Sequence, residues 1–230
     1  MSETAPDRFT TATTATASTT TRVRWYFDPI SPYAWLAWNG LVALPAGTRV
    51  EPCPVLFAGL LKHWGHTGPA ELAPKRLWTY RACQWQADQA GIRFRMPAAH
   101  PFNSLPWLRL CIAADNTPEA IQAVFEALWT TAGDPSDPAV LTAVAERLGV
   151  APARLASTDV KARLRDNTEV AIRAGVFGVP TLAVGDELFW GADAIAFAAA
   201  CLRNPAVLAT PEMLRIAHLP IGVARPGSLT

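Results

Sequence analysis

The sequence has little charge of either sign and no paired cysteines. Only 17% of the 230 residues are charged, and 20 Lys and Arg residues balance 19 Asp and Glu residues. No segment concentrates basic residues, so nothing favours a nucleic acid or an anionic membrane as a partner. The four cysteines form no C-x-x-C pair, which argues against a zinc knuckle and a dithiol redox centre and favours buried free thiols: Cys53, Cys83, Cys111 and Cys201.

Long apolar runs and a secretory leader are also missing. The longest apolar stretches, such as "AIAFAAACL", are too short to span a bilayer. The N-terminus lacks the basic start and continuous apolar core of a signal peptide, so we expect a cytoplasmic protein. The Thr- and Ala-rich residues 1–22 carry few large apolar side chains, which predicts a disordered tail.

Half of the residues are hydrophobic, enough for a sizeable globular core. Residues 23–27 have the aromatic and β-branched pattern of a buried strand, a helix is predicted over 32–44, and a second strand over 48–57. From 71 to 175 only helical signals are found, with helices over 73–91, 117–133, 137–149 and 157–175. Two short strands around Gly185-Asp186 then form a hairpin, and a last helix covers 192–202.

This order predicts an α/β fold, namely a thioredoxin-like domain interrupted by a helical insertion subdomain. Residues 23–60 and 176–203 form the thioredoxin-like domain, residues 61–175 the insertion, and residues 204–230 a C-terminal extension to which we assign no role.

Two prolines mark the places where chemistry is expected. Ser31 and Pro32 stand between the first strand and its helix, where Ser can cap the helix and Pro can open it, so the pair has a complete structural explanation. Val179-Pro180 precedes the hairpin; we expect a cis bond beside the start of the first helix, with the Val179 backbone free to pair with an extended peptide. The structural alternative is a trans proline that opens a strand.

Three stretches carry a family resemblance: "WYFDPISPYAWLAW", "GVFGVPTLAVGDELFWGADAI" and "KHWGHTGPAELAPKRLWTYRACQWQADQAGIRF". Together they resemble the 2-hydroxychromene-2-carboxylate isomerase family, kin of kappa-class glutathione transferases and, more distantly, of DsbA oxidoreductases. The resemblance runs from residue 23 to about 203 and implies a DsbA-like thioredoxin fold. It also implies glutathione as the cofactor and a small aromatic carboxylate as the substrate.

The resemblance assigns roles to residues at three sites. Ser31 would stabilise the glutathione thiolate at a helix N-terminus, because "SPYA" contains no sulfur of its own. Val179 and Pro180 would pair with the tripeptide backbone. The γ-glutamyl end would be held by Asp193, which would bind its ammonium, and by the rest of its turn: Trp190, Gly191 and Ala192. The structural alternative for Asp193 is a plain helix cap.

The substrate side is implied by Lys62 and the pair Phe102-Asn103, which resemble the family's pocket for the aromatic acid. The alternatives, a solvated Lys and a turn-forming Asn, carry equal weight. Lys75 and Arg76 resemble a basic stretch near the glycyl end of glutathione. The chain departs from the family at Ala192, where a polar residue is usual, and at Pro29, where Phe is usual.

Other features receive a structural interpretation. Of the nine tryptophans, we expect four in the core: Trp25, Trp38, Trp78 and Trp85. His63 and His66 have H-x-x-H spacing but no third ligand, so no metal is expected. The helical faces do not reveal whether the chain forms a homodimer.

Three other functions remain open. A kappa-type glutathione transferase would use the same thiolate but release a conjugate. A DsbA-like dithiol oxidoreductase is disfavoured because C-x-x-C is absent. A non-catalytic binding module would keep the fold and use Ser31 only as a cap.

Overall fold

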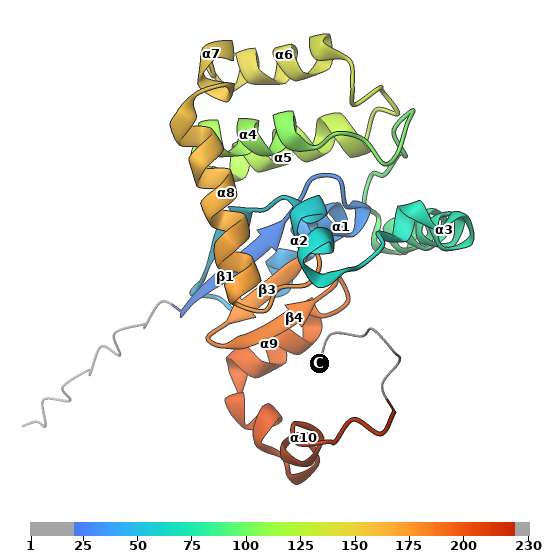
Figure 1. The fold of residues 1–230 in the computed structure, drawn as a ribbon, viewed down its shortest axis with the longest axis vertical. Helices are drawn as coiled ribbons and strands as arrows, with labels where there is room; N and C mark the ends of the chain where they lie inside the picture. The colour runs from blue at the N-terminus through green and yellow to red at the C-terminus, as the bar shows by residue number, and fades with distance from the viewer. Residues whose placement is uncertain (1–20, 224–230) are drawn as a thin grey trace, which may run out of the picture.

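A mixed four-stranded sheet lies at the centre of the molecule (Figure 1). The computed structural model describes residues 21–223. The strand order is β2-β1-β3-β4, with β1 parallel to β2 and antiparallel to β3, and β3 antiparallel to β4. The strands are β1 (Thr21–Phe27), β2 (Thr48–Pro54), β3 (Thr181–Val184) and β4 (Glu187–Trp190).

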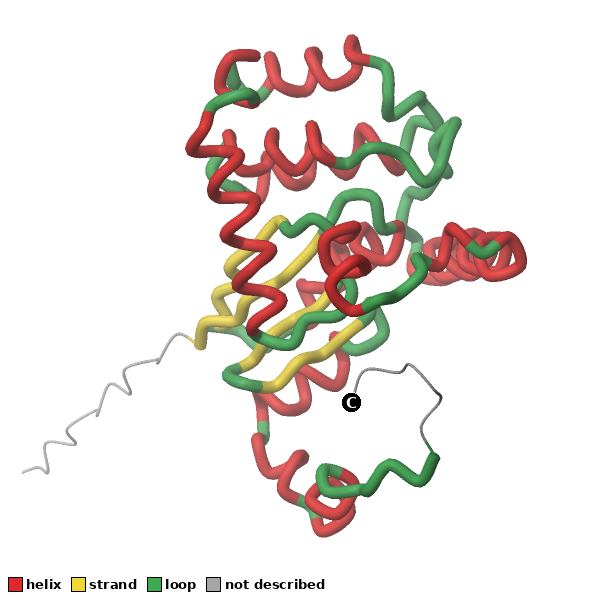
Figure 2. Tube along the Cα trace, viewed as in Figure 1, coloured by secondary structure: helices red, strands yellow, loops and turns green. Residues whose placement is uncertain are grey.

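Helices cover both faces of this sheet (Figure 2). Most begin with a proline in the first turn, where its missing N–H leaves no hydrogen bond unmade. The helices are α1 (Pro32–Gly40), α2 (Phe57–Trp64), α3 (Ala73–Ala90), α4 (Leu105–Ala113), α5 (Pro118–Trp129), α6 (Pro138–Arg147), α7 (Pro152–Leu155), α8 (Thr158–Arg173), α9 (Ile195–Arg203) and α10 (Pro211–Ile216). Short 3-10 helices cover Leu41–Ala43, Pro69–Glu71 and Pro205–Ala209.

The side chains of β1 alternate between the two faces, as the period of a strand requires. Val23, Trp25 and Phe27 enter the larger hydrophobic cluster, which α1, α5 and α9 also enter. Tyr26 points the other way, into a second cluster with residues of α2 and α8. The second half of β1 is therefore buried on both faces, which explains its run of three aromatic residues from Trp25 to Phe27, whereas Arg22 and Arg24 in the first half are exposed.

The helical insertion and the thioredoxin-like part share one core. Phe125 of α5 packs against Trp25, Phe27 and Trp35, with ring centroids 6.2, 5.8 and 5.8 Å away. The same cluster continues to Trp129 at the end of α5. The insertion is thus joined to the sheet by buried aromatic contacts rather than by its two connections alone.

Most predicted elements are present, with shifted ends. The hairpin around Gly185-Asp186 is confirmed, and the Val179-Pro180 bond is cis. Thr117 and Asp137 accept hydrogen bonds from the backbone N–H groups of Ala120 and Ala139, so both cap the helices that they were expected to open.

Several boundaries were wrong. β1 starts at Thr21, where it pairs with Thr48, so the end of the expected tail is ordered strand, while residues 1–20 lie outside the described residues. The first helix ends at Gly40 and continues only as a 3-10 turn over Leu41–Ala43. The second strand stops at Pro54, and α2 follows.

The expectation of purely helical structure from 71 to 175 was also wrong. Residues 92–104 form an irregular segment that includes the cis bond His100-Pro101. Its prolines at 97 and 101 have no backbone N–H to offer a helix, which accounts for the break.

The cysteine prediction is confirmed, since all four thiols are free and buried. The tryptophan prediction is only half right. Trp25 is 1% exposed and stacks on Trp38, but Trp78 and Trp85 are 71% and 63% exposed on α3. Their helix stands at the side of the molecule (Figure 1).

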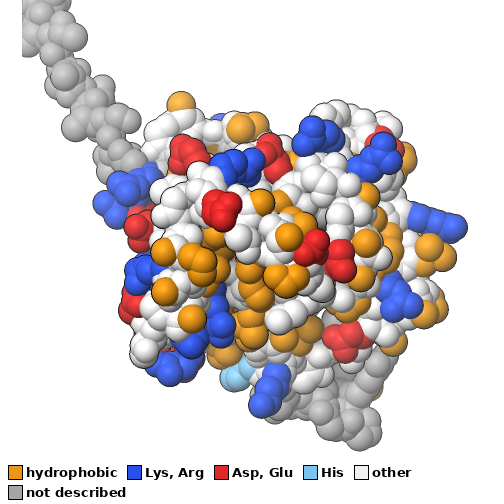
Figure 3. Space-filling view, turned by 90° about the horizontal axis from the view of Figure 1, so that it is seen from above, with side chains coloured by type: hydrophobic (Ala, Val, Ile, Leu, Met, Phe, Trp, Pro, Cys, Tyr) orange, Lys and Arg blue, Asp and Glu red, His pale blue; other side chains and the backbone are white. Residues whose placement is uncertain are grey.

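The surface carries both signs of charge. On the face seen in Figure 3, Lys and Arg side chains are mixed with Asp and Glu side chains and with hydrophobic groups, and neither sign dominates. Within residues 21–223, no helix combines the length and apolar character needed to cross a bilayer.

Replacing Phe125 tests whether the insertion and the sheet share a core. We expect Phe125→Ala to lower the free energy of unfolding by about 3–5 kcal/mol, because it empties a buried ring site between three aromatic side chains. Urea unfolding should still show one transition. Val42→Ala, at an 89% exposed position, is the control and should change stability by less than about 0.5 kcal/mol. Two separated transitions in the Phe125 variant would contradict a shared core.

Candidate functional site

The register of the sheet brings three distant segments together. Tyr26 of β1 lies opposite Thr181 of β3, so the residues after β1 lie beside the residues before β3. Thr181 in turn lies opposite Trp190, so the residues after β4 reach the same end of the sheet. The segments 28–31, 179–180 and 190–193 therefore meet, and they contain the predicted residues Ser31, Val179, Pro180 and Asp193.

The hydroxyl of Ser31 does not cap its helix. Ser31 occupies the cap position of α1, yet its side chain accepts no hydrogen bond from the helix backbone. Its Oγ instead donates to the carbonyl oxygen of Val179 across 3.4 Å. Ser31 is 9% exposed. The cap explanation therefore fails, and the hydroxyl faces the segment that precedes the cis proline.

The Val179 backbone offers a second polar group at the same place. Among the described residues, no group accepts a hydrogen bond from the Val179 N–H, which lies just before β3. The next carbonyl, that of Pro180, accepts from the N–H of Gly191 at 2.9 Å and so fastens the turn after β4 to this segment.

That turn depends on the conformation of Gly191. Its φ is +105°, which L side chains rarely adopt, and a Cβ at this position would lie 2.4 Å from Oδ1 of Asp193. The carboxylate of Asp193 thus lies over Gly191, where a side chain would be strained by this φ and would have to displace the carboxylate.

Asp193 is not the cap of α9. The cap position belongs to Ala194, and no side chain bonds the first N–H groups of that helix. Within residues 21–223, the Asp193 carboxylate forms no hydrogen bond or ion pair. Burial raises the pKa of Tyr33 to about 12, with Cys83 and Asp193 adding to the shift.

The fully buried side chain of Asp28 fixes the loop between β1 and α1 by hydrogen bonds. Oδ1 of Asp28 accepts from the N–H of Ile30 at 3.0 Å, and Oδ2 accepts from the N–H of Phe57 and the hydroxyl of Ser104, each at 3.0 Å. One carboxylate thereby joins the Ser31 loop to the starts of α2 and α4. Burial raises its pKa to about 6, while the three hydrogen bonds oppose the shift.

Two ring side chains, those of Trp129 and His100, form hydrogen bonds with backbone carbonyls of the same loop. Trp129 donates from Nε1 to the carbonyl of Pro29 at 2.9 Å. His100 contacts the carbonyl of Ile30 through Nε2 at 2.8 Å, and its Nδ1 lies 2.7 Å from the hydroxyl of Tyr80. Burial lowers the pKa of His100.

The profile of the DSBA-like thioredoxin domain family matches residues 22–203 of this chain. The chain belongs to this family. A 2-hydroxychromene-2-carboxylate isomerase of Sphingobium xenophagum is 27% identical over 191 residues, which cover 77% of this chain and 96% of the relative. Glutathione S-transferase kappa 1 of Homo sapiens is 26% identical over 177 residues, covering 69% of this chain and 78% of the relative.

A solved structure leads to the same family. A 2-hydroxychromene-2-carboxylate isomerase superposes with a TM-score of 0.69 at 26% identity, covering 81% of this chain and 98% of the other. These matches confirm the resemblance and the DsbA-like thioredoxin fold expected from the sequence. They also place this DSBA-like protein among relatives that are named isomerases and transferases.

The expected substrate residues of this DSBA-like protein lie in different settings. Phe102 is 9% exposed, and its ring packs against His100 and Trp129 at 5.9 and 6.3 Å. Asn103 is exposed, and its Oδ1 accepts from the N–H of Leu105 at 3.1 Å, which is a turn-forming role. Lys62 is exposed in the last turn of α2. The role of all three in substrate binding stays a prediction.

The remaining predicted side chains lie around α2 and α3. Lys75 and Arg76 are in the first turn of α3, where Arg76 donates to the carbonyl of Ala70 at 3.3 Å. His63 is followed at Gly65 by the end of its helix, so His66 lies beyond α2. No group of three metal-ligating side chains occurs in the part of the chain that the structure describes.

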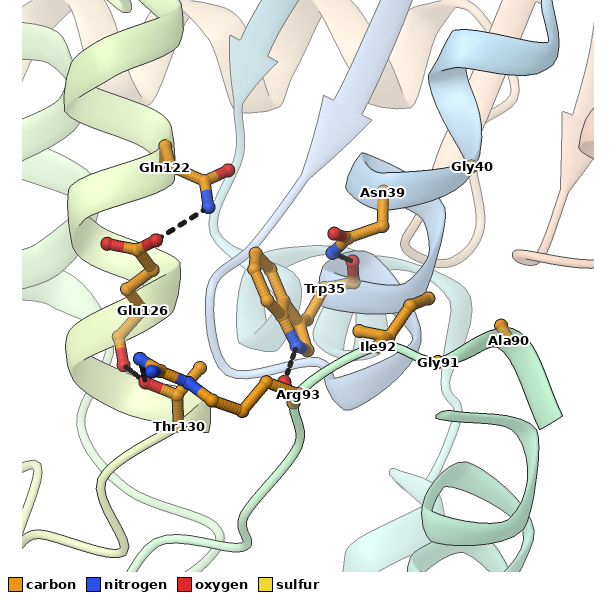
Figure 4. A pocket seen from close by; sticks show the side chains of 10 residues that line it. All are labelled: Trp35, Asn39, Gly40, Ala90, Gly91, Ile92, Arg93, Gln122, Glu126 and Thr130. Atoms are coloured by element: carbon orange, nitrogen blue, oxygen red, sulfur yellow. Dashed lines mark hydrogen bonds between the residues drawn. The ribbon is translucent and has the colours of Figure 1, made fainter. Parts of the chain in front are cut away.

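A separate pocket lies away from this site, beside the C-terminal half of α1. It has a volume of about 480 Å³ and its polar side chains bond mainly to one another: Asn39 to the carbonyl of Trp35, Gln122 to Glu126, and Arg93 to Thr130 (Figure 4). None of the predicted site residues lines this pocket. Its lining consists of Trp35, Asn39, Gly40, Ala90, Gly91, Ile92, Arg93, Gln122, Glu126 and Thr130. We therefore do not assign the function to it.

Sequence reasoning missed the residues that hold the loop: Asp28, Tyr80, His100 and Trp129. Asp28 could have been noticed, because an acid directly after a buried strand and before Ser31 needs partners. The others lie 49 or more positions after Ser31, and no spacing rule connects them to it.

The raised pKa of Asp28 has a consequence for stability. In the unfolded chain an Asp titrates near 3.9, so between about pH 4 and 6 the folded protein binds more protons than the unfolded one. The stability that Asp28 contributes is present below pH 4 and is lost as the pH rises through 6, by about 3 kcal/mol.

Asp28→Asn removes this titration but leaves the N–H of Phe57 without its acceptor. We expect the variant to be less stable than the wild type at pH 4, with the difference shrinking by pH 7. Urea unfolding at intervals across this range measures it, with Asp186→Asn in the exposed hairpin turn as the control. A difference that stays constant from pH 4 to 7 would show that Asp28 does not titrate in this window.

Proposed function

We propose that this protein is a glutathione-dependent cis-trans isomerase of a small aromatic carboxylic acid of the 2-hydroxychromene-2-carboxylate type. The observation that carries the proposal is the Ser31 hydroxyl, which leaves its helix uncapped and faces the backbone of Val179. Relatives named as such isomerases support the reaction class.

The groups at this end of the sheet fit a thiol tripeptide. The N–H of Val179 and the sheet end beside it suit an extended peptide backbone, which adds to a strand by main-chain hydrogen bonds. The carboxylate of Asp193 suits an ammonium group, and the N–H groups at the start of α9 suit a carboxylate. A γ-glutamyl end carries both of these charges.

Ser31 lies where a sulfur would be activated. A thiol reacts as its thiolate, and a free thiol is mostly protonated at neutral pH. The Ser31 hydroxyl can donate to a thiolate, and the positive end of the α1 dipole favours the same charge. Glutathione, when bound, supplies a thiolate that adds reversibly to a conjugated carbon, which lets a double bond rotate.

The chain supplies no reactive sulfur itself. Position 31 is Ser, and burial raises the pKa of each native thiol. A dithiol oxidoreductase is therefore a poorer candidate. For the substrate, we propose that Lys62 binds the carboxylate and that Phe102 and Asn103 line the aromatic pocket.

A kappa-like glutathione transferase is the second candidate, favoured by relatives of that name from Homo sapiens and Caenorhabditis elegans. It would use the same thiolate site. The two are separated by products: an isomerase returns free glutathione, and a transferase consumes it as a conjugate.

Ser31→Ala should slow isomerisation at pH 7 by about tenfold, because loss of the hydroxyl donor raises the pKa of the bound thiol by about one unit. The rates of variant and wild type should converge as the pH rises above the pKa of the free thiol. Initial rates with saturating glutathione across this range measure the effect. A loss that is independent of pH would contradict a role in thiolate stabilisation.

Gly191→Ala should weaken glutathione binding by at least about tenfold, because its Cβ displaces the Asp193 carboxylate and costs a charge-assisted hydrogen bond. Gly185→Ala is the matched control: its φ is +59°, yet no atom lies within 4 Å of its Cβ. Both variants should lose stability from backbone strain, but only the first should lose affinity in calorimetry. Equal affinity in the two variants would remove Asp193 from the site.

A further inference from the structure

The segment between α3 and α4 brings His100 to the backbone of the Ser31 loop. Nε2 of His100 lies 2.8 Å from the carbonyl oxygen of Ile30, the residue before Ser31. No other described group bonds that oxygen. His100 is 70 positions further along the chain, so this contact links the helical insertion directly to the start of α1.

The peptide group between Ile30 and Ser31 is held at both ends. Its carbonyl oxygen is bonded by His100, and its N–H donates to the carbonyl of Asp28 at 3.0 Å. A peptide group is planar, so fixing both its oxygen and its nitrogen fixes the plane that adjoins the Cα of Ser31. On the other side of that Cα, the carbonyl of Ser31 accepts from the N–H of Ala34 at 3.0 Å, so the backbone that carries the hydroxyl is held on both sides.

The proton on His100 can be placed from its partners. A carbonyl only accepts, so Nε2 carries the proton that bonds Ile30. Nδ1 then accepts from the hydroxyl of Tyr80 at 2.7 Å when the ring is neutral, and donates to it when the ring is charged, while that hydroxyl can turn to the His100 carbonyl at 2.9 Å. The bond to Ile30 therefore survives in both protonation states. The charged and titratable neighbours are Arg76 and Tyr80 on α3 and, below the loop, Asp28.

The imidazole ring is also packed in place. It lies edge-on to Tyr80 at 5.3 Å, edge-on to Phe102 at 5.9 Å and tilted against Trp129 at 5.7 Å between ring centroids. Trp129 bonds the carbonyl of Pro29, the neighbour of Ile30. A ring with so many contacts has few alternative rotamers, so its hydrogen bond to the loop is rigid.

We propose that His100, oriented by Tyr80, is a positioning residue for Ser31: its bond to the Ile30 carbonyl aims the hydroxyl and the free N–H groups of α1 at a bound sulfur. Its consequence for catalysis rests on the proposed function. The positioning itself rests only on contacts within the protein, so it can be tested without glutathione.

The test uses Ser31→Cys as a probe of the helix N-terminus. Alkylation by iodoacetamide follows the thiolate, so its rate against pH gives the pKa of the introduced thiol. The native cysteines are buried, and burial raises the pKa of each, so the introduced thiol dominates the signal in the folded protein. In this background we expect a pKa below the usual value of about 8.5.

Adding His100→Leu should raise that pKa by about one unit, which slows alkylation at pH 7 by about tenfold. His100→Gln should bring the rate back to within about threefold of the Ser31→Cys parent, because its amide N–H can replace Nε2–H as the donor to Ile30. His218→Leu, an exposed histidine near the C-terminal end of the described chain, is the matched control and should change nothing. Urea unfolding of each variant shows that the folded protein is being compared.

An unchanged pKa in the His100→Leu variant would overturn the proposal. Equal pKa values for the Leu and Gln variants would also overturn it, because His100 would then act by packing alone. Glutathione binding to the wild type is measured in parallel by calorimetry. If glutathione does not bind, the proposed function fails while the alkylation result still decides the role of His100.

Discussion

The loop from Asp28 to Ser31 is the constraint on which the rest of the site depends. Its backbone polar groups are bonded by side chains from three directions: Asp28 takes the N–H of Ile30, Trp129 the carbonyl of Pro29, and His100 the carbonyl of Ile30. With these bonds made, Ser31 has one orientation, toward Val179. To donate to a thiolate, the hydroxyl has to turn its single proton away from the Val179 carbonyl, but the backbone that carries it does not have to be reorganised.

This arrangement explains why the helical insertion and the sheet share a core. Trp129 at the end of α5 and His100 between α3 and α4 both bond the loop, and Tyr80 on α3 bonds His100. The aromatic contacts of Phe125 with the sheet hold these parts in register with β1. A thioredoxin-like domain without the insertion would keep the Ser31 helix but lose two of the three bonds that orient its first turn.

Local periodicity and turn signals predict the strands and most helices, and the meeting of Ser31 with Val179-Pro180 is expected from the thioredoxin-like order of these elements. The same patterns do not predict His100 or Trp129 as partners of the loop, because hydrogen bonds between residues about 70 or 100 positions apart leave no periodic trace. They also misplace Trp78 and Trp85, since an apolar side chain does not reveal which helix face meets the core. A Ser31 cap is expected from the local sequence alone. The sheet register brings Val179 near, and the Ser31 hydroxyl bonds its carbonyl instead.

In the proposed function, the start of α1 lowers the pKa of a bound thiol. The most direct measurement is the ultraviolet absorbance of the thiolate in the complex of the wild-type protein with glutathione, followed against pH. We expect the thiol to titrate clearly below the value of about 8.5 for a free thiol. Binding with an unshifted thiol titration would contradict it, because the Ser31 hydroxyl and the α1 dipole would then not act on the sulfur.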